Sequence, residues 1–600
     1  MREPQAFVVP KFKSLLAQNS IFAPVKDYGM RMKWFGLLIF LTSVLYAQNF
    51  PTDYFVSPVL IPIQLSGTFG ELRSNHFHSG IDIKTQGVTG LPVLAAAEGY
   101  VSRIRVSPRG FGNAIYINHP NGFTTVYGHM ERFTPEISAY IKAEQYRQKS
   151  FEVDLYLGPE QFKFSKGDEI GKSGNSGSSG GPHLHFEIRD TKTEEPLNPL
   201  LFGFNMSDNR APELYKLLII PLDGDARING KRRIHSMTLT KVKEGVFKTS
   251  GEDVLIGGKV GFAIEAYDKH TGQENRNGVY SVKLSFEGKQ VFEQKMDRFS
   301  FDETRYLNAC ITYDQLQCCN VKALKTYVDP GNKLAMLKGQ PPGILIDERR
   351  NFLIYIEVAD VAGNKSTVNF NFWGDFNFAS RTLEGTDPTT LRKDLFPYNR
   401  INKYLTNDLD LYIPEGTLYR DIIFKYSVDS TGNGRYFSNL HRVHETSEPV
   451  HKHYALSIRA VNYPEQHRNK LCIVELGGNV PSYIGGDFKD DFVTAQVRQF
   501  GTFAVMADTT APRLKANDLV EGKNIGSQRT FNFTISDNLS GVKKYNAYLN
   551  GEWILLEYDA KSNRMYYNVD ERVKTGNNTV RIVVSDDKDN ESELSINFVK

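Results

Sequence analysis

The sequence of 600 residues lacks an excess of charge of either sign. It contains 72 Lys and Arg against 69 Asp and Glu, a formal net charge of +3 at pH 7. Proteins that bind nucleic acid concentrate positive charge at their binding surface, and this overall balance carries no such signal. We therefore expect no nucleic acid among the partners of the protein.

Cysteine is also scarce, with four residues in the whole chain. This number is too small for a disulfide framework, and no two cysteines have the C-x-x-C spacing that is typical of a structural zinc site. Cys318 and Cys319 are neighbours and are not expected to bridge to each other. The cysteines are interpreted as incidental to the function.

The sequence contains no apolar run of the ~20 residues that a membrane-spanning helix needs. A shorter run at residues 34–47 follows a basic start and ends in a small residue, which predicts a signal peptide over residues 30–47 and an upstream extension over residues 1–29. Leu45 is larger than the residue preferred near a cleavage site, so an uncleaved anchor is the alternative, and only then is the membrane a partner. The protein is expected to be exported to the periplasm or cell envelope, or secreted.

What the sequence does contain is a β-strand pattern over most of its length. Short alternating runs broken by Gly, Pro and Asn begin near residue 50, and a helical stripe stands out at residues 135–148. This pattern predicts a mainly β protein with a first domain over residues 50–205. A chain of this length is too long for one core, so roughly three to five domains are expected.

An internal repeat organises the rest of the chain. The segment IEVADVAGNKS at residues 356–366 resembles IVVSDDKDNES at residues 582–592, and an Asn-Phe pair follows both at the same spacing. Two related β-sandwich modules are therefore expected over residues 212–375 and 508–600, the first with an insertion at about residues 290–350. Both modules resemble bacterial immunoglobulin-like domains.

Three further features of this region carry less information. Residues 376–507 are β-rich and predict a module of unclassified type. Asp360 and Asp586 recur in the repeat and could bind calcium, although the commoner use of Asp at such positions is to form a turn. A histidine-rich patch between residues 441 and 453 has interspersed charges, which favours a solvated face over a second metal site.

The sequence GGPHLHFEI places His183 and His185 two residues apart at the start of an alternating run. Successive side chains of a strand point to opposite faces, so the two imidazoles share one face, ~7 Å apart. One can bind a metal while the other acts beside it. His78 and Asp82 add an imidazole and a carboxylate, and catalytic zinc commonly takes three such ligands and leaves one position for water. Either histidine of the pair completes that set, and His129 offers a further imidazole.

Three segments together, HSGID at residues 78–82, YGH at 127–129 and SGNSG leading to GPHLHFE at 173–187, resemble the lysostaphin/LytM-type zinc endopeptidases of peptidase family M23. The resemblance covers about residues 55–205 and implies a compact antiparallel β-sheet domain with a groove. The substrate that it implies is the peptide part of bacterial peptidoglycan. The site residues that it implies are His78, Asp82 and His185 as ligands of one Zn2+ per chain, with His183 and His129 as the catalytic histidines.

The mechanism that follows from this site relies on histidine. Zinc lowers the pKa of bound water and polarises a carbonyl group. The chain has no HExxH glutamate, so a histidine must transfer the protons. His183 is expected to be the base and His129 its partner, with the assignment between the two left open. Residues 130–167 are longer than in compact versions of the domain and are expected to narrow or cover the groove.

Three hypotheses for the function remain. The leading one is an exported zinc endopeptidase that cuts peptidoglycan crosslinks, with β-modules that position it at the wall or at cell-envelope protein partners. All five site positions are filled, which favours activity over the degenerate family members. The second is a non-catalytic wall-binding protein or an activator of another wall hydrolase. The third is an adhesion or assembly protein whose β-modules carry the function.

Overall fold

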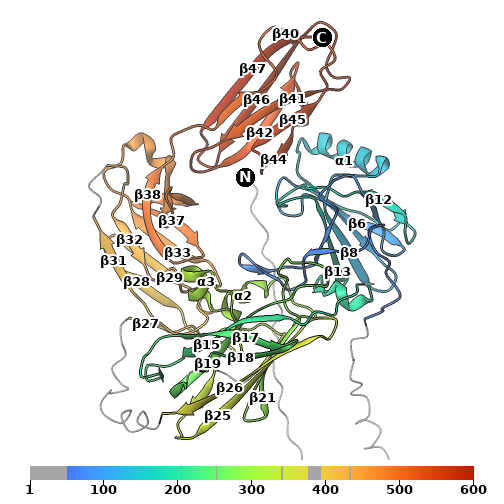
Figure 1. Ribbon diagram of the computed structural model, residues 1–600. Coiled ribbons are helices and arrows are strands. Elements are labelled where there is room, and N and C mark those ends of the chain that lie inside the picture. Colours follow the sequence, from blue (N-terminus) through green and yellow to red (C-terminus); the bar gives the residue numbers. More distant parts are fainter. Residues whose placement is uncertain (1–49, 205, 252, 340–341, 376–393, 431–433) are drawn as a thin grey trace, which may run out of the picture. The chain divides into compact units, whose positions relative to one another are not determined.

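The computed structural model describes residues 50–600 except 205, 252, 340–341, 376–393 and 431–433 (Figure 1). The predicted signal peptide and upstream extension lie outside the described residues. No helix within the described part of the chain has the length and apolar character needed to cross a membrane. The described residues are mainly in β-strands, as the alternating pattern predicts.

A nine-stranded antiparallel sheet forms the centre of the first domain, shown in blue to cyan in Figure 1. Two of its strands lie off the main strand order: β11 (Lys163–Phe164) pairs with β6 (Gly99–Val106), and β14 (Pro196–Leu197) pairs with β13 (His183–Asp190). The others follow in the order β1 (Leu65–Gly67), β4 (Ile81–Lys84), β13 (His183–Asp190), β8 (Phe123–Met130), β7 (Asn113–Asn118), β6 (Gly99–Val106) and β10 (Val153–Tyr156).

Strand β13 lies inside this sheet, between β4 and β8, and is buried on both faces. Leu184, Phe186 and Ile188 are fully buried apolar residues and alternate with the polar side chains of the strand. Side chains two residues apart on a strand share a face. The side chains that follow the two histidines on their face of β13 are therefore polar, whereas Leu184, Phe186 and Ile188 on the other face are apolar. This polar face of a central strand is where the candidate site lies.

Helix α1 (Pro135–Gln148) forms where the helical stripe predicts it. Proline at its first turn suits the helix start, and Lys149 ends it in the left-handed conformation, φ 50°. Its buried side chains include Ile137 and Ile141. Nearby, a small sheet has the order β5, β12, β9; its strands are β5 (Pro92–Leu94), β12 (Glu169–Lys172) and β9 (Arg132–Phe133).

A hairpin of β2 (Leu72–Arg73) and β3 (His76–Phe77) connects β1 to β4. Phe69 and Phe77 belong to one hydrophobic core with residues between 214 and 372. Both rings pack against the ring of Phe299, at centroid distances of 5.0 and 5.4 Å. The segment that leads to His78 is therefore held by apolar packing outside its own sheet.

The twelve-stranded sheet that follows supplies most of this core. The polypeptide between Phe299 and Leu324 adds short helices η2 (Thr304–Tyr306), α2 (Leu307–Cys310) and α3 (Tyr313–Cys319). The strands are β15 (Glu213–Pro221), β16 (Arg227–Ile228), β17 (His235–Lys243), β18 (Val246–Thr249), β19 (Leu255–Tyr267), β20 (Ser281–Phe286), β21 (Lys289–Lys295), β22 (Leu324–Lys325), β23 (Leu337–Gly339), β24 (Ile344–Ile346), β25 (Asn351–Ala359) and β26 (Lys365–Gly374).

Two sheets of five strands enclose the core of the region from residue 395 to 507, with a short pair of β27 (Leu395–Phe396) and β30 (Ile422–Ile423). One sheet contains β28 (Asn402–Leu405), β29 (Leu409–Ile413), β33 (Tyr454–Arg459), β37 (Phe492–Val497) and β36 (Asp487–Lys489). The other contains β31 (Tyr426–Asp429), β32 (Leu440–Val443), β38 (Gly501–Ala507), β34 (Leu471–Glu475) and β35 (Ser482–Gly485).

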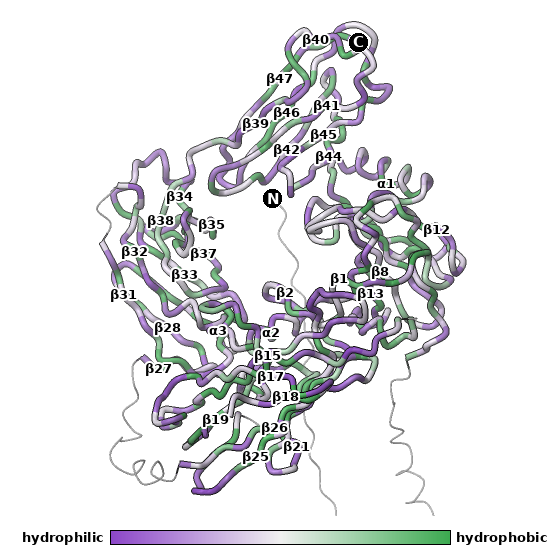
Figure 2. Tube along the Cα trace, viewed as in Figure 1, coloured by the Kyte–Doolittle hydropathy of each residue, from purple (hydrophilic) through white to green (hydrophobic). Residues whose placement is uncertain are grey.

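The last region, residues 513–599, is a sandwich of two sheets over one core. Hydrophobic and hydrophilic residues alternate along its strands (Figure 2), as a sheet with one buried face requires. One sheet has β39 (Arg513–Ala516), β41 (Thr530–Ser536), β45 (Arg564–Asn568) and β44 (Glu557–Asp559). The other has β40 (Lys523–Asn524), β47 (Glu591–Val599), β46 (Asn577–Asp586), β42 (Val542–Leu549) and β43 (Glu552–Ile554).

Two expectations are wrong. Cys318 and Cys319, at the end of α3, form a disulfide with each other. The histidine-rich patch is not a solvated face, because His441 and His451 are buried and lie against tyrosine. Their neighbours Arg442 and Lys452 are exposed, as is His453, so the charged side chains of this patch face solvent while His441 and His451 do not.

Candidate metal centre and active site

The pairing of β4 with β13 brings the predicted ligands together. His185 is opposite Asp82 and His183 is opposite Lys84. On its other side His185 is opposite Gly128 of β8, so the next residue of that strand, His129, lies beside the pair. His129 has a φ of 59°, a conformation that is uncommon for a residue with a side chain and that occurs often at functional sites.

His78, Asp82 and His185 form the tightest cluster of the site. Asp82 Oδ1 lies 3.0 Å from His78 Nε2 and 3.0 Å from His185 Nδ1, and these two nitrogens are 3.1 Å apart. Ligands on a tetrahedral zinc ion with ~2.0 Å bonds lie about 3.3 Å from one another. All three residues are buried. The donor set and its spacing therefore fit a zinc-type ion.

The outer nitrogens of these imidazoles have partners that orient them. His78 Nδ1 donates a hydrogen bond to the Thr68 carbonyl oxygen at 2.8 Å. The proton is therefore on Nδ1, and Nε2 carries a lone pair that faces the centre of the cluster. His185 Nε2 lies 2.9 Å from Glu187 Oε1, which leaves Nδ1 for the centre of the cluster. Metal-binding histidines usually bond their second nitrogen in this way, which fixes the tautomer and the ring orientation.

Glu187 is a functional residue that the sequence reasoning missed. It is 0% exposed, accepts hydrogen bonds from Ser79 and His185, and pairs with Arg189, whose Nε donates at 2.6 Å. Burial raises the pKa of Glu187, but the charge of Arg189 and these hydrogen bonds outweigh it and lower the pKa to about 2. The signal was present, since the two-residue period of the strand continues from His185 to Glu187 and Arg189.

His129 and His183 lie together beside the cluster, with ring centroids 4.7 Å apart. His129 Nδ1 donates to the Ser176 carbonyl oxygen at 2.9 Å, and His183 Nδ1 donates to the Gly181 carbonyl oxygen at 2.8 Å. Each ring therefore presents Nε2 as its proton acceptor. His183 Nε2 is 3.4 Å from Asp82 Oδ1.

The electrostatics of the site favour positive charge at its centre. Burial opposes ionisation of Asp82, but the charge of His78 and hydrogen bonds from the imidazoles outweigh it and hold the pKa well below its usual range. Burial lowers the pKa of His185, whereas hydrogen bonds to Asp82 and Glu187 raise it, to about 9. Burial and the nearby charges of His185 and His183 lower the pKa of His129 to about 3, so His129 is neutral at physiological pH.

A groove with a volume of about 640 Å³ runs past Asp82 and His183. None of its described lining residues lies between 130 and 167, so the expectation that this segment narrows the groove is wrong for this cavity. Helix α1 packs against β9 and β10 instead. Two basic side chains that sequence reasoning did not select, Arg73 and Lys84, line it together with Ile61, Pro62, Gln64, Ser66, Gln86, Gly87, Gly180, Gly181 and Pro182.

The fold and the donor set define a mainly β domain with a candidate metal centre and two adjacent histidines. Residues 76–146 match the sequence model of peptidase family M23. The chain therefore contains a domain of peptidase family M23. Residues 393–508, which sequence reasoning left unclassified, match the model of a Zu5-like domain.

Several known proteins are similar to this chain over part of its length. The chain is 32% identical over 146 residues to DD-carboxypeptidase/endopeptidase Mpg of Neisseria meningitidis, a match that covers 24% of this chain and 27% of that protein. It is 32% identical over 111 residues to peptidoglycan DD-endopeptidase ShyA of Vibrio cholerae, covering 18% and 20%. The catalytic domain of the M23 protein EnpA from Enterococcus faecalis is 27% identical, with 25% of this chain and 95% of that chain covered and a TM-score of 0.18. The chain thus covers about a quarter of the length of Mpg.

Proposed function

We propose that the protein is a zinc-dependent endopeptidase that hydrolyses peptide crosslinks of bacterial peptidoglycan after export to the periplasm or cell envelope. The observation that carries this proposal is the oriented set of four imidazoles and one carboxylate, in which each outer ring nitrogen has its own oxygen partner. The peptidoglycan substrate rests on the similarity to ShyA, whose name states that substrate.

His78, Asp82 and His185 would hold one zinc ion. When bound, zinc supplies Lewis acidity toward a peptide carbonyl group and toward water. The protein holds the ligands in place before binding, because Thr68 and Glu187 fix the two rings. Preorganised ligands of this kind reduce the reorganisation that accompanies the reaction.

His183 is the proposed general base. Its Nε2 takes a proton from the attacking water and later returns it to the leaving amine. Asp82, 3.4 Å away, stabilises the imidazolium that forms in between. His129 has its pKa held at about 3, so it stays neutral and accepts a hydrogen bond through Nε2 that orients the water.

The test compares the chain from residue 48 to 600 with single His→Ala variants at 129, 183 and 185. Each is incubated with purified crosslinked sacculi, released peptides are identified by mass spectrometry, and bound zinc is measured by elemental analysis. We expect His185→Ala to lose both zinc and cleavage, and the other two to keep zinc and lose cleavage. His76→Ala is the matched control, because His76 is exposed and is not among the residues of the cluster.

Two outcomes contradict the proposal. Cleavage that persists after complete removal of zinc excludes a zinc-dependent reaction. A parent chain that binds zinc, is folded and releases no peptide from any sacculus favours the activator alternative. Export is tested separately by sequencing the N-terminus of the protein from the envelope fraction of its own cells, where a start near residue 48 is expected.

A further inference from the structure

Two groups of three aspartates occupy equivalent positions in the related modules. In each module one aspartate precedes an Ala-Pro pair at the module start, one follows a strand (β19 or β41), and one lies at the end of the first strand of the last hairpin (β25 or β46). We call these groups the first and the last aspartate cluster. The first contains Asp208, Asp268 and Asp360, and the last contains Asp508, Asp537 and Asp586.

The same asparagine contacts join two members of each cluster. In the last cluster, Asn590 Nδ2 donates to Asp586 Oδ2 at 2.7 Å and to the carbonyl oxygen of Asp508 at 3.0 Å. In the first cluster, Asn364 Nδ2 makes both equivalent bonds, at 2.8 and 3.2 Å. Two modules with different loops around this point have therefore kept the same arrangement, which is more than a turn requires.

The clusters place several carboxylates out of solvent and close together. Asp268 and Asp360 are buried in the first cluster, and Asp508 and Asp586 in the last. The potential ligand atoms of Asp508, Asp537 and Asp586 all lie within 4.8 Å of one another. Among the described residues, no Lys or Arg forms an ion pair with any of the six aspartates; the single ion pair is between His270 and Asp268. Buried carboxylates without a counter-charge are costly, so a positive charge is expected between them.

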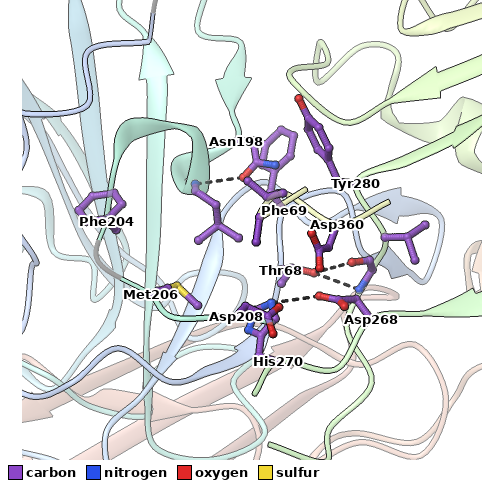
Figure 3. A pocket seen from close by; sticks show the side chains of 15 residues that line it. Thr68, Phe69, Asn198, Phe204, Met206, Asp208, Asp268, His270, Tyr280 and Asp360 are labelled. Atoms are coloured by element: carbon purple, nitrogen blue, oxygen red, sulfur yellow. Dashed lines mark hydrogen bonds and ion pairs between the residues drawn. The ribbon is translucent and has the colours of Figure 1, made fainter. Parts of the chain in front are cut away.

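Carboxylate oxygens without a hydrogen-bond partner indicate where the positive charge would bind. Asp268 is 2% exposed, and its Oδ1 has no hydrogen-bond partner. Asp208, Asp268, His270 and Asp360 line one cavity of about 120 Å³, and Figure 3 shows their side chains gathered there. Asp537 Oδ1 is likewise buried without a partner in the last cluster. Buried polar atoms almost always have a partner, so an unpaired carboxylate oxygen at the same point of two modules calls for a ligand.

We infer that each aspartate cluster binds one divalent cation of the calcium type. The donors that the two clusters share are carboxylate oxygens, which suit calcium better than zinc, and backbone carbonyls or water can complete its six to eight ligands. His270 has no equivalent in the last cluster, where the position two residues after the central aspartate is Leu539. Because His270 Nε2 already lies 3.2 Å from Asp268 Oδ2, the first cluster binds calcium more weakly than the last.

The cation has a structural consequence at two junctions of the chain. Asp208 and Asp508 lie in the segments that lead into their modules, whereas the other four aspartates lie at the ends of strands of the modules themselves. A cation shared among them ties each leading segment to the strands of its module. Calcium binding therefore stiffens both junctions, and it does so whether or not the M23 domain is catalytic.

The test uses calcium chloride and the chain from residue 48 to 600, freed of metal with a chelator and then exchanged into chelator-free buffer. Calorimetric titration is expected to show two calcium ions per chain, with dissociation constants of roughly 10⁻⁴ to 10⁻³ M as for extracellular modules. Asp537→Asn keeps an oxygen that can accept the backbone bonds from Leu539 and Gly541, and replaces the unpaired oxygen with an amide. We expect one ion per chain in Asp537→Asn and in Asp268→Asn, and none in the double variant.

Thermal unfolding separates loss of calcium from loss of folding. Without calcium the variants are expected to unfold at the same temperature as the parent or higher, since a repelling charge has been removed, and added calcium raises the midpoint of the parent more than that of either variant. Asp589→Asn is the control, because Asp589 is exposed and outside the cluster. Absence of calcium binding at 10-fold above the expected dissociation constants, or a stoichiometry that both variants leave unchanged, overturns the inference.

Discussion

Glu187 offers the sharpest test of how the M23 site is built. The substitution Glu187→Gln keeps the size and one acceptor oxygen of the side chain but removes its charge. In the parent, that charge faces His185 Nε2 at 2.9 Å and Arg189 Nε at 2.6 Å, with all three side chains buried. The variant therefore leaves the buried guanidinium of Arg189 without its main anion and weakens the bond that orients His185.

Two magnitudes follow from these contacts. Removing one partner of a buried ion pair typically costs about 3–5 kcal/mol of folding stability, because the other charge remains buried. Loss of the group that orients a metal-binding histidine typically lowers metal affinity by about 10–100-fold. We expect Glu187→Gln to show both effects, with the zinc dissociation constant raised by at least about 10-fold.

The assay is competition for zinc against a chromogenic chelator, accompanied by urea unfolding of the zinc-free protein. Glu194→Gln is the matched control, since Glu194 also pairs with Arg189, at 3.4 Å, but its side chain is 60% exposed. An exposed pair of this kind contributes about 0–1 kcal/mol. Equal zinc affinity in the two variants would refute the role assigned to Glu187.

Three further predictions concern the same domain. Gly174→Ala should abolish cleavage and lower the unfolding midpoint, because an added Cβ would lie 2.3 Å from Glu131 N and 2.7 Å from the His129 carbonyl oxygen; Gly180→Ala, with open space around it, should be tolerated. Phe77→Ala should destabilise the chain by about 3–5 kcal/mol, measured by urea unfolding, since the ring is fully buried in a shared core. Burial lowers the pKa of His119 to about 4 from 6.5, so its contribution of up to about 3 kcal/mol is present above pH 6.5 and lost as the pH falls toward 4. His119→Gln should make stability less dependent on pH over that range, and an unchanged decline would contradict this assignment.

Local pattern was enough to select the histidines and the aspartate that the structure brings together at the candidate site. The two-residue period at residues 183–185 places both histidines on one face, and that period is a property of any strand whatever surrounds it. The helix at 135–148 was equally readable, because its apolar stripe and its proline at the first turn are local signals. Glu187 could have been found in the same way, by extending the period one step further.

Contacts between distant residues could not be read in this way. Asp82 and His185 are separated by 103 residues, and the register of β4 against β13 brings them within 3.0 Å. The lining of the groove depends on which elements pack beside that sheet, and α1 packs elsewhere. The aspartate clusters depend on the leading segment of each module meeting two of its turns. Strand period and helix stripes are set by neighbouring residues in the chain, whereas register and cluster formation arise only when separate elements pack on a common core.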